Sequence, residues 1–156
     1  MKRDRGFTLI EVIVVIAIVG ILSATAIPFY TIYRQRTYGS EARIMFKQIL
    51  EAEIAYYLQN DAFFPPIGVY PGDRIDISHN PAINTPTEIA QIKQALKIII
   101  PEGHNLDFTI ERGLDPILLI DAVWVTVASY NLSFPLFGDG SRFITGYVNS
   151  NGQFGP

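Results

Sequence analysis

The chain has 156 residues, of which 49% are hydrophobic, and its mean hydropathy of +0.23 is high for a purely soluble protein of about one domain. Its formal net charge of −3 gives no electrostatic footprint for nucleic acid, so no specific nucleic-acid site is identifiable. It contains no cysteine, which excludes a disulfide framework and a thiolate metal site.

An uncharged segment lies near the N-terminus. No Asp, Glu, Lys or Arg occurs between Glu11 and Arg34, and a helix over residues 12–33 would extend roughly 33 Å, close to a hydrocarbon core of about 30 Å. Three basic residues among the first five precede this segment, and the positive-inside tendency places the N-terminus in the cytoplasm. A membrane-spanning helix is therefore predicted, with most of the chain outside.

The helical pattern continues beyond the apolar segment. Apolar residues recur there at spacings of four, three and four, at Met45, Ile49, Ala52 and Tyr56. A single helix over residues 7–59 is predicted, apolar all round in its first half and amphipathic in its second half. The amphipathic half is expected to lie against a globular domain, and the change near Arg34 is expected to mark the membrane surface.

Proline and glycine are frequent in residues 61–84, which are predicted to form an irregular loop. The next four residues, Thr85-Pro86-Thr87-Glu88, have the form of a capping box in which Thr85 is the N-cap. A second helix is predicted from this point to about Ile98. Its inner face is predicted to consist of Ile89, Ile92, Ala95 and Leu96.

From His104 onward, short β-rich runs are separated by turn residues. The predicted strands are 106–111, 117–128, 130–137 and 142–148, arranged as an antiparallel meander. One face of such a sheet needs an apolar partner, which the long helix can supply. The predicted fold class is α+β, with a long N-terminal membrane-spanning and amphipathic helix packed on a C-terminal antiparallel sheet.

The stretch Gly6-Phe7-Thr8-Leu9-Ile10-Glu11 lies between a short basic leader and the apolar helix. It resembles the N-terminal signature of type IV prepilins and pseudopilins, and the resemblance is specific over roughly residues 5–33. It implies that prepilin peptidase, a membrane aspartyl peptidase, cuts after Gly6 and that Phe7 becomes the N-methylated mature N-terminus. It further implies that Glu11 guides assembly.

The same resemblance implies three parts: a leader peptide at residues 1–6, a transmembrane and filament-core helix at 7–33, and an exported globular domain at 34–156. The implied function is that of a non-enzymatic structural subunit of a type IV pilus, serving adhesion, twitching motility or DNA uptake. Implied partners are further copies of the chain, the peptidase, the pilus assembly platform, minor pilins and the inner membrane. The implied location is the inner membrane before assembly and the extracellular pilus afterwards.

Glu11 also stands out on physical grounds. An ionised carboxylate costs about 2.5–3.5 kcal/mol at the centre of a membrane helix, and somewhat less near its end. No Lys, Arg or His lies between Thr8 and Tyr33, so its own helix offers no cationic partner. The amine of a neighbouring subunit's Phe7 can supply one. The alternative is that Glu11 reaches the headgroup region and is solvated there.

Two residues predict a weak point in the apolar helix. Pro28 lacks an amide N–H and its ring collides with the carbonyl of Ala24, while Gly20 weakens a helix by about 1 kcal/mol. The helix is therefore expected to kink or loosen there. Within the family, the same stretch is expected to unwind partly and make the filament extensible, whereas the alternative is an ordinary kinked membrane helix.

Other interpretations rest on weaker patterns. A pseudopilin of a type II secretion system is the alternative within the family. The segment Ala24-Thr25-Ala26 has the form of a secretory signal-peptide end, which would release a soluble binding domain beginning at Ile27. Against this cleavage, Glu11 interrupts the apolar region and Pro28 would be the second mature residue.

No catalytic motif and no cofactor-binding motif is present, so no enzymatic activity is expected. His79 and His104 have no cysteine or acidic residue at metal-ligand spacing. Four oxygen-bearing residues offer ligands to Ca²⁺, although their spacing departs from that of the calcium loop; they are Asp73, Asp76, Ser78 and Asn80.

Overall fold

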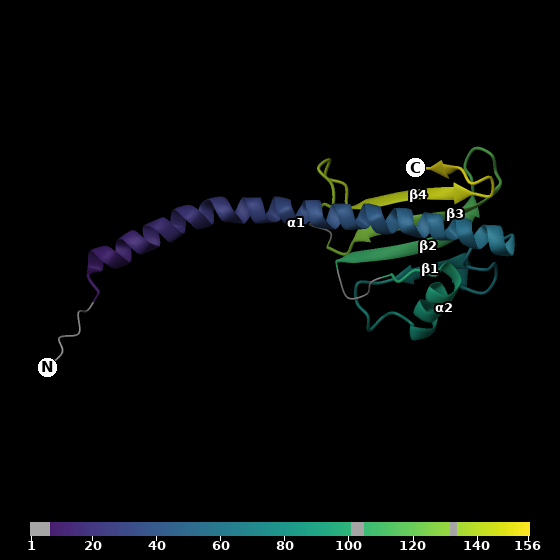
Figure 1. Ribbon diagram of the computed structural model, residues 1–156, viewed down its shortest axis with the longest axis horizontal. Helices are drawn as coiled ribbons and strands as arrows, with labels where there is room; N and C mark the ends of the chain where they lie inside the picture. The colour runs from purple at the N-terminus through teal and green to yellow at the C-terminus, as the bar shows by residue number, and fades with distance from the viewer. Residues whose placement is uncertain (1–6, 101–104, 132–133) are drawn as a thin grey trace. The chain divides into compact units, whose positions relative to one another are not determined.

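The computed structural model describes residues 7–100, 105–131 and 134–156 (Figure 1). The chain divides into two compact units, Met1–Arg34 and Gln35–Pro156. Helix α1 (Leu9–Asn60) contributes its first half to the first unit and its second half to the second. We call Gln35–Pro156 the globular unit.

The globular unit contains one antiparallel five-stranded sheet in which the strands follow chain order. Its strands are β1 (Arg74–Ile77), β2 (Leu106–Leu114), β3 (Asp121–Ser129), β4 (Phe143–Asn149) and β5 (Phe154–Gly155). A short 3-10 helix, η1 (Pro71–Asp73), precedes β1, and helix α2 (Pro86–Leu96) lies between β1 and β2. The predicted α+β fold with an antiparallel meander is confirmed.

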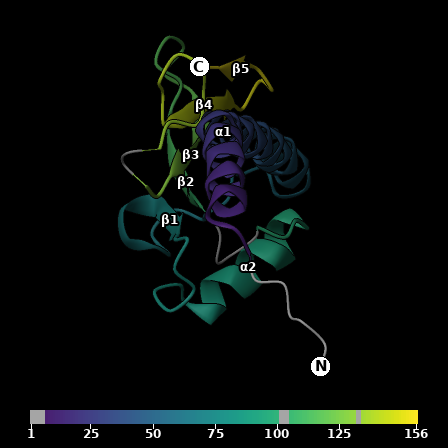
Figure 2. The same cartoon turned by 90° about the vertical axis from the view of Figure 1, so that its left-hand side faces the viewer.

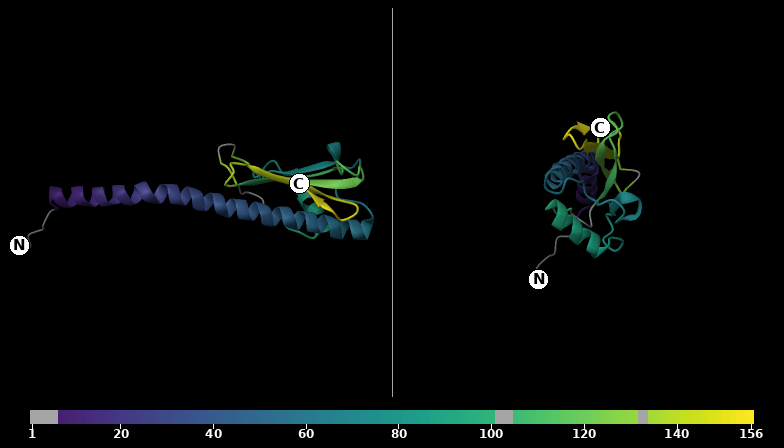
Figure 3. Two further views of the ribbon diagram at one scale, coloured as in Figure 1. Left: turned by 90° about the horizontal axis from the view of Figure 1, so that it is seen from above. Right: turned by 90° about the vertical axis from the view of Figure 1, so that its right-hand side faces the viewer.

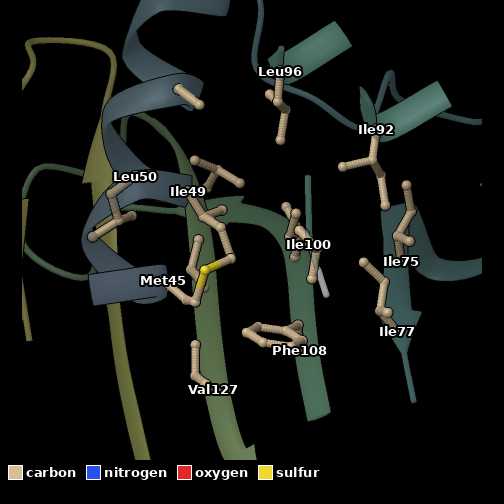
Figure 4. Close-up of a cluster of buried hydrophobic side chains, with 14 of the residues drawn as sticks. Met45, Ile49, Leu50, Ile75, Ile77, Ile92, Leu96, Ile100, Phe108 and Val127 are labelled. Atoms are coloured by element: carbon tan, nitrogen blue, oxygen red, sulfur yellow. The ribbon is translucent and has the colours of Figure 1, made fainter. Parts of the chain in front are cut away.

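The second half of α1 and helix α2 cover the same face of the sheet (Figures 2 and 3). Strand registers align the inward-facing apolar residues, as in the pairs Phe108 with Val127 and Ile110 with Val125. From α1, the predicted residues Met45, Ile49 and Ala52 are buried in this core, and Tyr56 packs against it half-buried. Figure 4 shows the central part of the cluster.

Helix α2 also places its predicted face inward. Ile92 and Leu96 are buried, and Ile89 and Ala95 pack against the core. Its predicted capping box is wrong, because Thr85 makes no side-chain hydrogen bond to the helix. Pro86 at the first helical position and the backbone bond from Ile89 N to Thr85 O start the helix without it.

The predictions for two segments are wrong: the loop 61–84 contains a strand, and the predicted strand 130–137 is not one among its described residues. The predicted loop 61–84 contains strand β1, whose residues Ile75 and Ile77 alternate with polar neighbours and complete the edge of the sheet. The described residues of the predicted strand 130–137 form no strand. Instead, the backbone N–H groups of Leu136 and Phe137 both donate to Ser141 O in a tight turn. Leu136 and Phe137 join the core from this turn.

A buried carboxyl group connects α1 to the segment that follows it. The Glu53 side chain is fully buried, and its Oε2 accepts a hydrogen bond from Phe64 N at 3.0 Å. Its Oε1 has no partner among the described residues. Nearby, the Arg112 guanidinium donates to Phe63 O at 3.1 Å and pairs with Asp121. Burial raises the pKa of Glu53 well above its usual value, against the opposing effects of the Phe64 bond and of Arg112.

We expect this carboxyl group to make stability depend on pH. Above pH of about 4.3 the unfolded chain releases the Glu53 proton while the folded chain retains it, so stability falls as pH rises toward the folded pKa. Glu53→Gln keeps an acceptor for Phe64 N and removes this fall. The measurement is the free energy of unfolding of the full chain in detergent at pH 5 and pH 8. The matched control is Glu51→Gln on the exposed side of α1, which should retain the wild-type dependence.

Candidate assembly site

Thr8 and Glu11 form a reciprocal pair at the first turn of α1. Glu11 Oε2 accepts hydrogen bonds from the backbone N and from the hydroxyl of Thr8, both at 2.8 Å. The Thr8 hydroxyl in turn accepts a bond from Glu11 N at 3.3 Å. With Leu9 as the first helical residue, this is a capping box in which Thr8 is the N-cap and Glu11 is the third helical position.

The capping box gives Glu11 a polar partner in its own helix, which the sequence analysis missed. The signal was available, because Thr8 and Glu11 have the same spacing as Thr85 and Glu88. The carboxylate also lies at the positive end of the helix dipole, where negative charge is favourable. No described residue donates to the second oxygen, Oε1, so this atom is available to a partner outside the helix.

Phe7 directly precedes this cap and is 84% exposed. Gly6 lies outside the described residues. The structure therefore describes only Phe7 of the two residues that flank the predicted cleavage point. Cleavage after Gly6 and methylation of Phe7 stay predictions.

The helix surface beyond the cap is apolar and uncovered. Every residue from Phe7 to Tyr33 is exposed, including the large apolar side chains that dominate this segment. Among the described residues, α1 is the one helix long and apolar enough to cross a membrane. A signal sequence near an N-terminus shares these properties, so length and composition do not separate the two interpretations.

Gly20 and Pro28 both lie within α1, whose helical assignment continues through them. A Cβ added at Gly20 would meet no atom within 4 Å, so no contact within the chain requires glycine there. Near the proline, the hydroxyls of Thr25 and Thr31 donate to Leu22 O and Ile27 O. These bonds leave neither hydroxyl unsatisfied in apolar surroundings. The predicted loosening at Gly20 and Pro28 stays a prediction.

The other candidate residues have local partners. His79 Nδ1 lies 2.9 Å from Asp107 Oδ1, and its ring stacks on Tyr130. His104 lies outside the described residues. Asp76 is paired with Arg74 at 2.7 Å, and Asn80 Oδ1 accepts a bond from Ala82 N. Among the described residues, no group of three His, Cys, Asp or Glu is arranged to hold a metal ion.

Comparison with known proteins identifies the N-terminal segment. Residues 1–27 match the family described as the prokaryotic N-terminal methylation motif. The chain is 41% identical to the type IV major pilin protein PilA of Myxococcus xanthus over 61 residues. These residues make up 39% of this chain and 28% of PilA. It is 44% identical over 70 residues to the type IV major pilin protein PilE of Neisseria gonorrhoeae, and the match covers 45% of this chain and 38% of PilE.

A fimbrial protein of Pseudomonas aeruginosa is 55% identical over 42 residues, which cover 27% of each chain. In all three relatives the match covers well under half of the protein's own length. No solved structure matches. The matched methylation motif includes Phe7, Thr8 and Glu11, the residues that form or precede the helix cap. Over its N-terminal motif and helix, the chain is thus similar to type IV major pilins.

Proposed function

We propose that the chain is the structural subunit of a type IV pilus, polymerised through the exposed apolar half of α1. The observation that carries this proposal is the combination of an uncovered apolar helix surface with a carboxylate at its first turn. An apolar surface of this extent is stable in lipid or when covered by other protein chains. A filament core made of such helices supplies the second environment, and the similarity to major pilins supports it.

In this proposal the chain is inserted in the inner membrane with its N-terminus in the cytoplasm. Prepilin peptidase removes residues 1–6, Phe7 is methylated, and the assembly platform transfers the subunit into an extracellular filament with minor pilins. Residues 7–33 form the filament core and residues 34–156 the exported domain. The filament serves adhesion, twitching motility or DNA uptake, and the proposal assigns no catalytic activity to the subunit.

Glu11 has a defined role in this scheme. Its Oε2 is held by Thr8, which fixes the carboxylate at the start of the helix. Its Oε1 is then available to the positively charged amine of Phe7 in the next subunit. A charged amine entering an apolar filament core needs such a partner, because an unpaired buried charge is strongly unfavourable.

We expect N-terminal sequencing of the mature protein to begin at methylated Phe7. The reason is the position of Gly6 between the basic leader and the capped helix. Mass spectrometry of filaments sheared from producing cells gives the same information and shows whether this chain is abundant in them. A mature protein that begins at Ile27 contradicts the proposal, and a correctly processed chain found only in the cell envelope indicates a pseudopilin.

A further inference from the structure

An open pocket of about 420 Å³ lies in the globular unit, where the end of α1, the segment after it and helix α2 meet. The ribbon segments around it are visible in the right-hand view of Figure 3. We call it the helix-end pocket. Its volume lies within the range of small-molecule sites, which is about 300–1,000 Å³. Nothing in the proposed assembly of the filament uses it.

Aromatic rings line the inner part of the helix-end pocket. Phe64 is buried, and Tyr56 and Tyr70 are half-buried. Both tyrosine rings meet Phe64 edge to face, at centroid distances of 5.8 Å and 6.2 Å. The Tyr70 hydroxyl is held by Gln91 Oε1. These contacts fix the orientation of the rings, so the apolar wall is formed before any ligand arrives.

Exposed polar groups line the outer part of the pocket. The side-chain amides of Gln59 and Gln94 and the ammonium group of Lys97 all border it. Among the described residues, none of these three side chains has a hydrogen-bond or ion-pair partner. Each amide supplies both donors and an acceptor, and Lys97 supplies three donors and a positive charge. No aspartate or glutamate lines the pocket, so no carboxylate in its lining neutralises this charge.

Lys97 also has an unusual backbone conformation. It is the C-cap of α2 and has a φ of 58°, which glycine or asparagine usually provides at the end of a helix. A lysine in this left-handed conformation costs free energy, of the order of 1 kcal/mol. A positive side chain at this end of the helix interacts favourably with the helix dipole. The same charge borders the helix-end pocket.

We propose that the helix-end pocket binds a saccharide that carries a carboxylate. The apolar face of a pyranose ring packs on tyrosine rings, and its hydroxyl groups are matched by amides that both donate and accept. Tyr56 and Tyr70 provide the rings, Gln59 and Gln94 provide the amides, and Lys97 binds the carboxylate. This inference concerns the globular unit and holds whether or not the chain forms a pilus.

The test uses the full chain in a detergent whose headgroup is not a sugar, with glucuronate, glucose and acetate as probes. Saturation-transfer NMR titrations measure the dissociation constant of each. We expect glucuronate to bind at least tenfold more tightly than glucose, because only glucuronate pairs with Lys97. Acetate should bind at least tenfold more weakly than glucuronate, because it lacks the ring. Glucuronate binding no tighter than that of either other probe overturns the proposal.

The matched variants are Lys97→Asn and Lys93→Gln, which each remove one positive charge at or near α2. Asparagine tolerates the left-handed conformation at position 97, so the helix end is retained. We expect Lys97→Asn to weaken glucuronate binding at least tenfold and to leave glucose binding unchanged. Lys93 does not line the pocket, so Lys93→Gln should bind as the wild type does. Unchanged glucuronate binding by Lys97→Asn, with a wild-type circular dichroism spectrum, also overturns the proposal.

Discussion

Gly39→Ala is expected to destabilise the globular unit by about 3 kcal/mol or more. A Cβ built on Gly39 lies 2.2 Å from the carbonyl oxygen of Leu136, a distance that real Cβ atoms do not show. The obstacle is backbone in a tight turn whose Leu136 and Phe137 are buried, so it cannot rotate away as a side chain can. Overpacking of this kind typically costs 1–3 kcal/mol and occasionally more. The gain in helix propensity of about 1 kcal/mol is smaller.

The substitution is also expected to disturb two contacts between α1 and the same turn. Gln35 Nε2 donates to Phe137 O at 2.6 Å, and the Arg43 guanidinium lies over the Phe137 ring. Moving the turn away from position 39 strains both contacts. We therefore expect loss of native structure around Phe137 before the sheet itself unfolds.

The measurement is denaturant unfolding of the full chain in detergent, followed by the fluorescence of Trp124 in β3. Gly20→Ala is the matched control, since it is the same substitution in the same helix at a position with no atom within 4 Å. The control should leave the midpoint of the globular unit unchanged. A Gly39→Ala midpoint equal to that of wild type would mean that α1 does not pass as close to the turn as described.

The sequence predicts the fold wherever a long periodic pattern exists. The apolar and amphipathic halves of α1 and the inner face of α2 were predicted because their apolar residues recur at helical spacing over several turns. The antiparallel order followed from short β-rich runs joined by turn residues. These features depend on local patterns, and the structure retains them.

The sequence failed where distant contacts decide the local structure. Residues 130–137 were predicted to form a strand, but Leu136 and Phe137 are held in a turn and packed into the core beside α1. Strand β1 lies between proline-rich and glycine-rich residues and is stabilised by its pairing with β2. The helix-end pocket was missed for the same reason, since Tyr56, Tyr70 and Lys97 come from three separate elements.

Of the two residues in the helix cap, one was predicted from the sequence and the other was not. Glu11 was found from its cost in an apolar segment, which needs no knowledge of the fold. Thr8 has the capping-box spacing to Glu11, but a helix predicted from residue 7 places Thr8 inside the helix, whereas α1 begins at Leu9 and makes Thr8 its N-cap. The same pattern at Thr85 predicted a bond that the structure does not contain. A capping motif therefore does not by itself predict the bond, since Thr85 occupies the N-cap of α2 and makes no side-chain hydrogen bond.

Glu11→Ala is expected to reduce filament yield more than tenfold while leaving membrane insertion and processing intact. Alanine removes the carboxylate that would pair with the Phe7 amine of the next subunit in an apolar core. Breaking a buried ion pair by removing one partner costs about 3–5 kcal/mol, and 1.4 kcal/mol corresponds to a factor of ten. Insertion itself should improve slightly, because an ionised carboxylate is unfavourable in lipid. The measurement compares subunit abundance in the membrane fraction with the yield of sheared filaments.

Glu11→Gln and Thr8→Val separate the charge of this site from its hydrogen bonds. Glutamine fits the third position of a capping box, so Glu11→Gln retains the bonds with Thr8 and loses only the charge. Thr8→Val removes the hydroxyl and retains the charge. If the ion pair between subunits drives docking, Glu11→Gln fails to assemble as Glu11→Ala does, and Thr8→Val loses less. Normal filaments from Glu11→Gln at wild-type expression would show instead that the capped helix end is sufficient and that the charge is not needed.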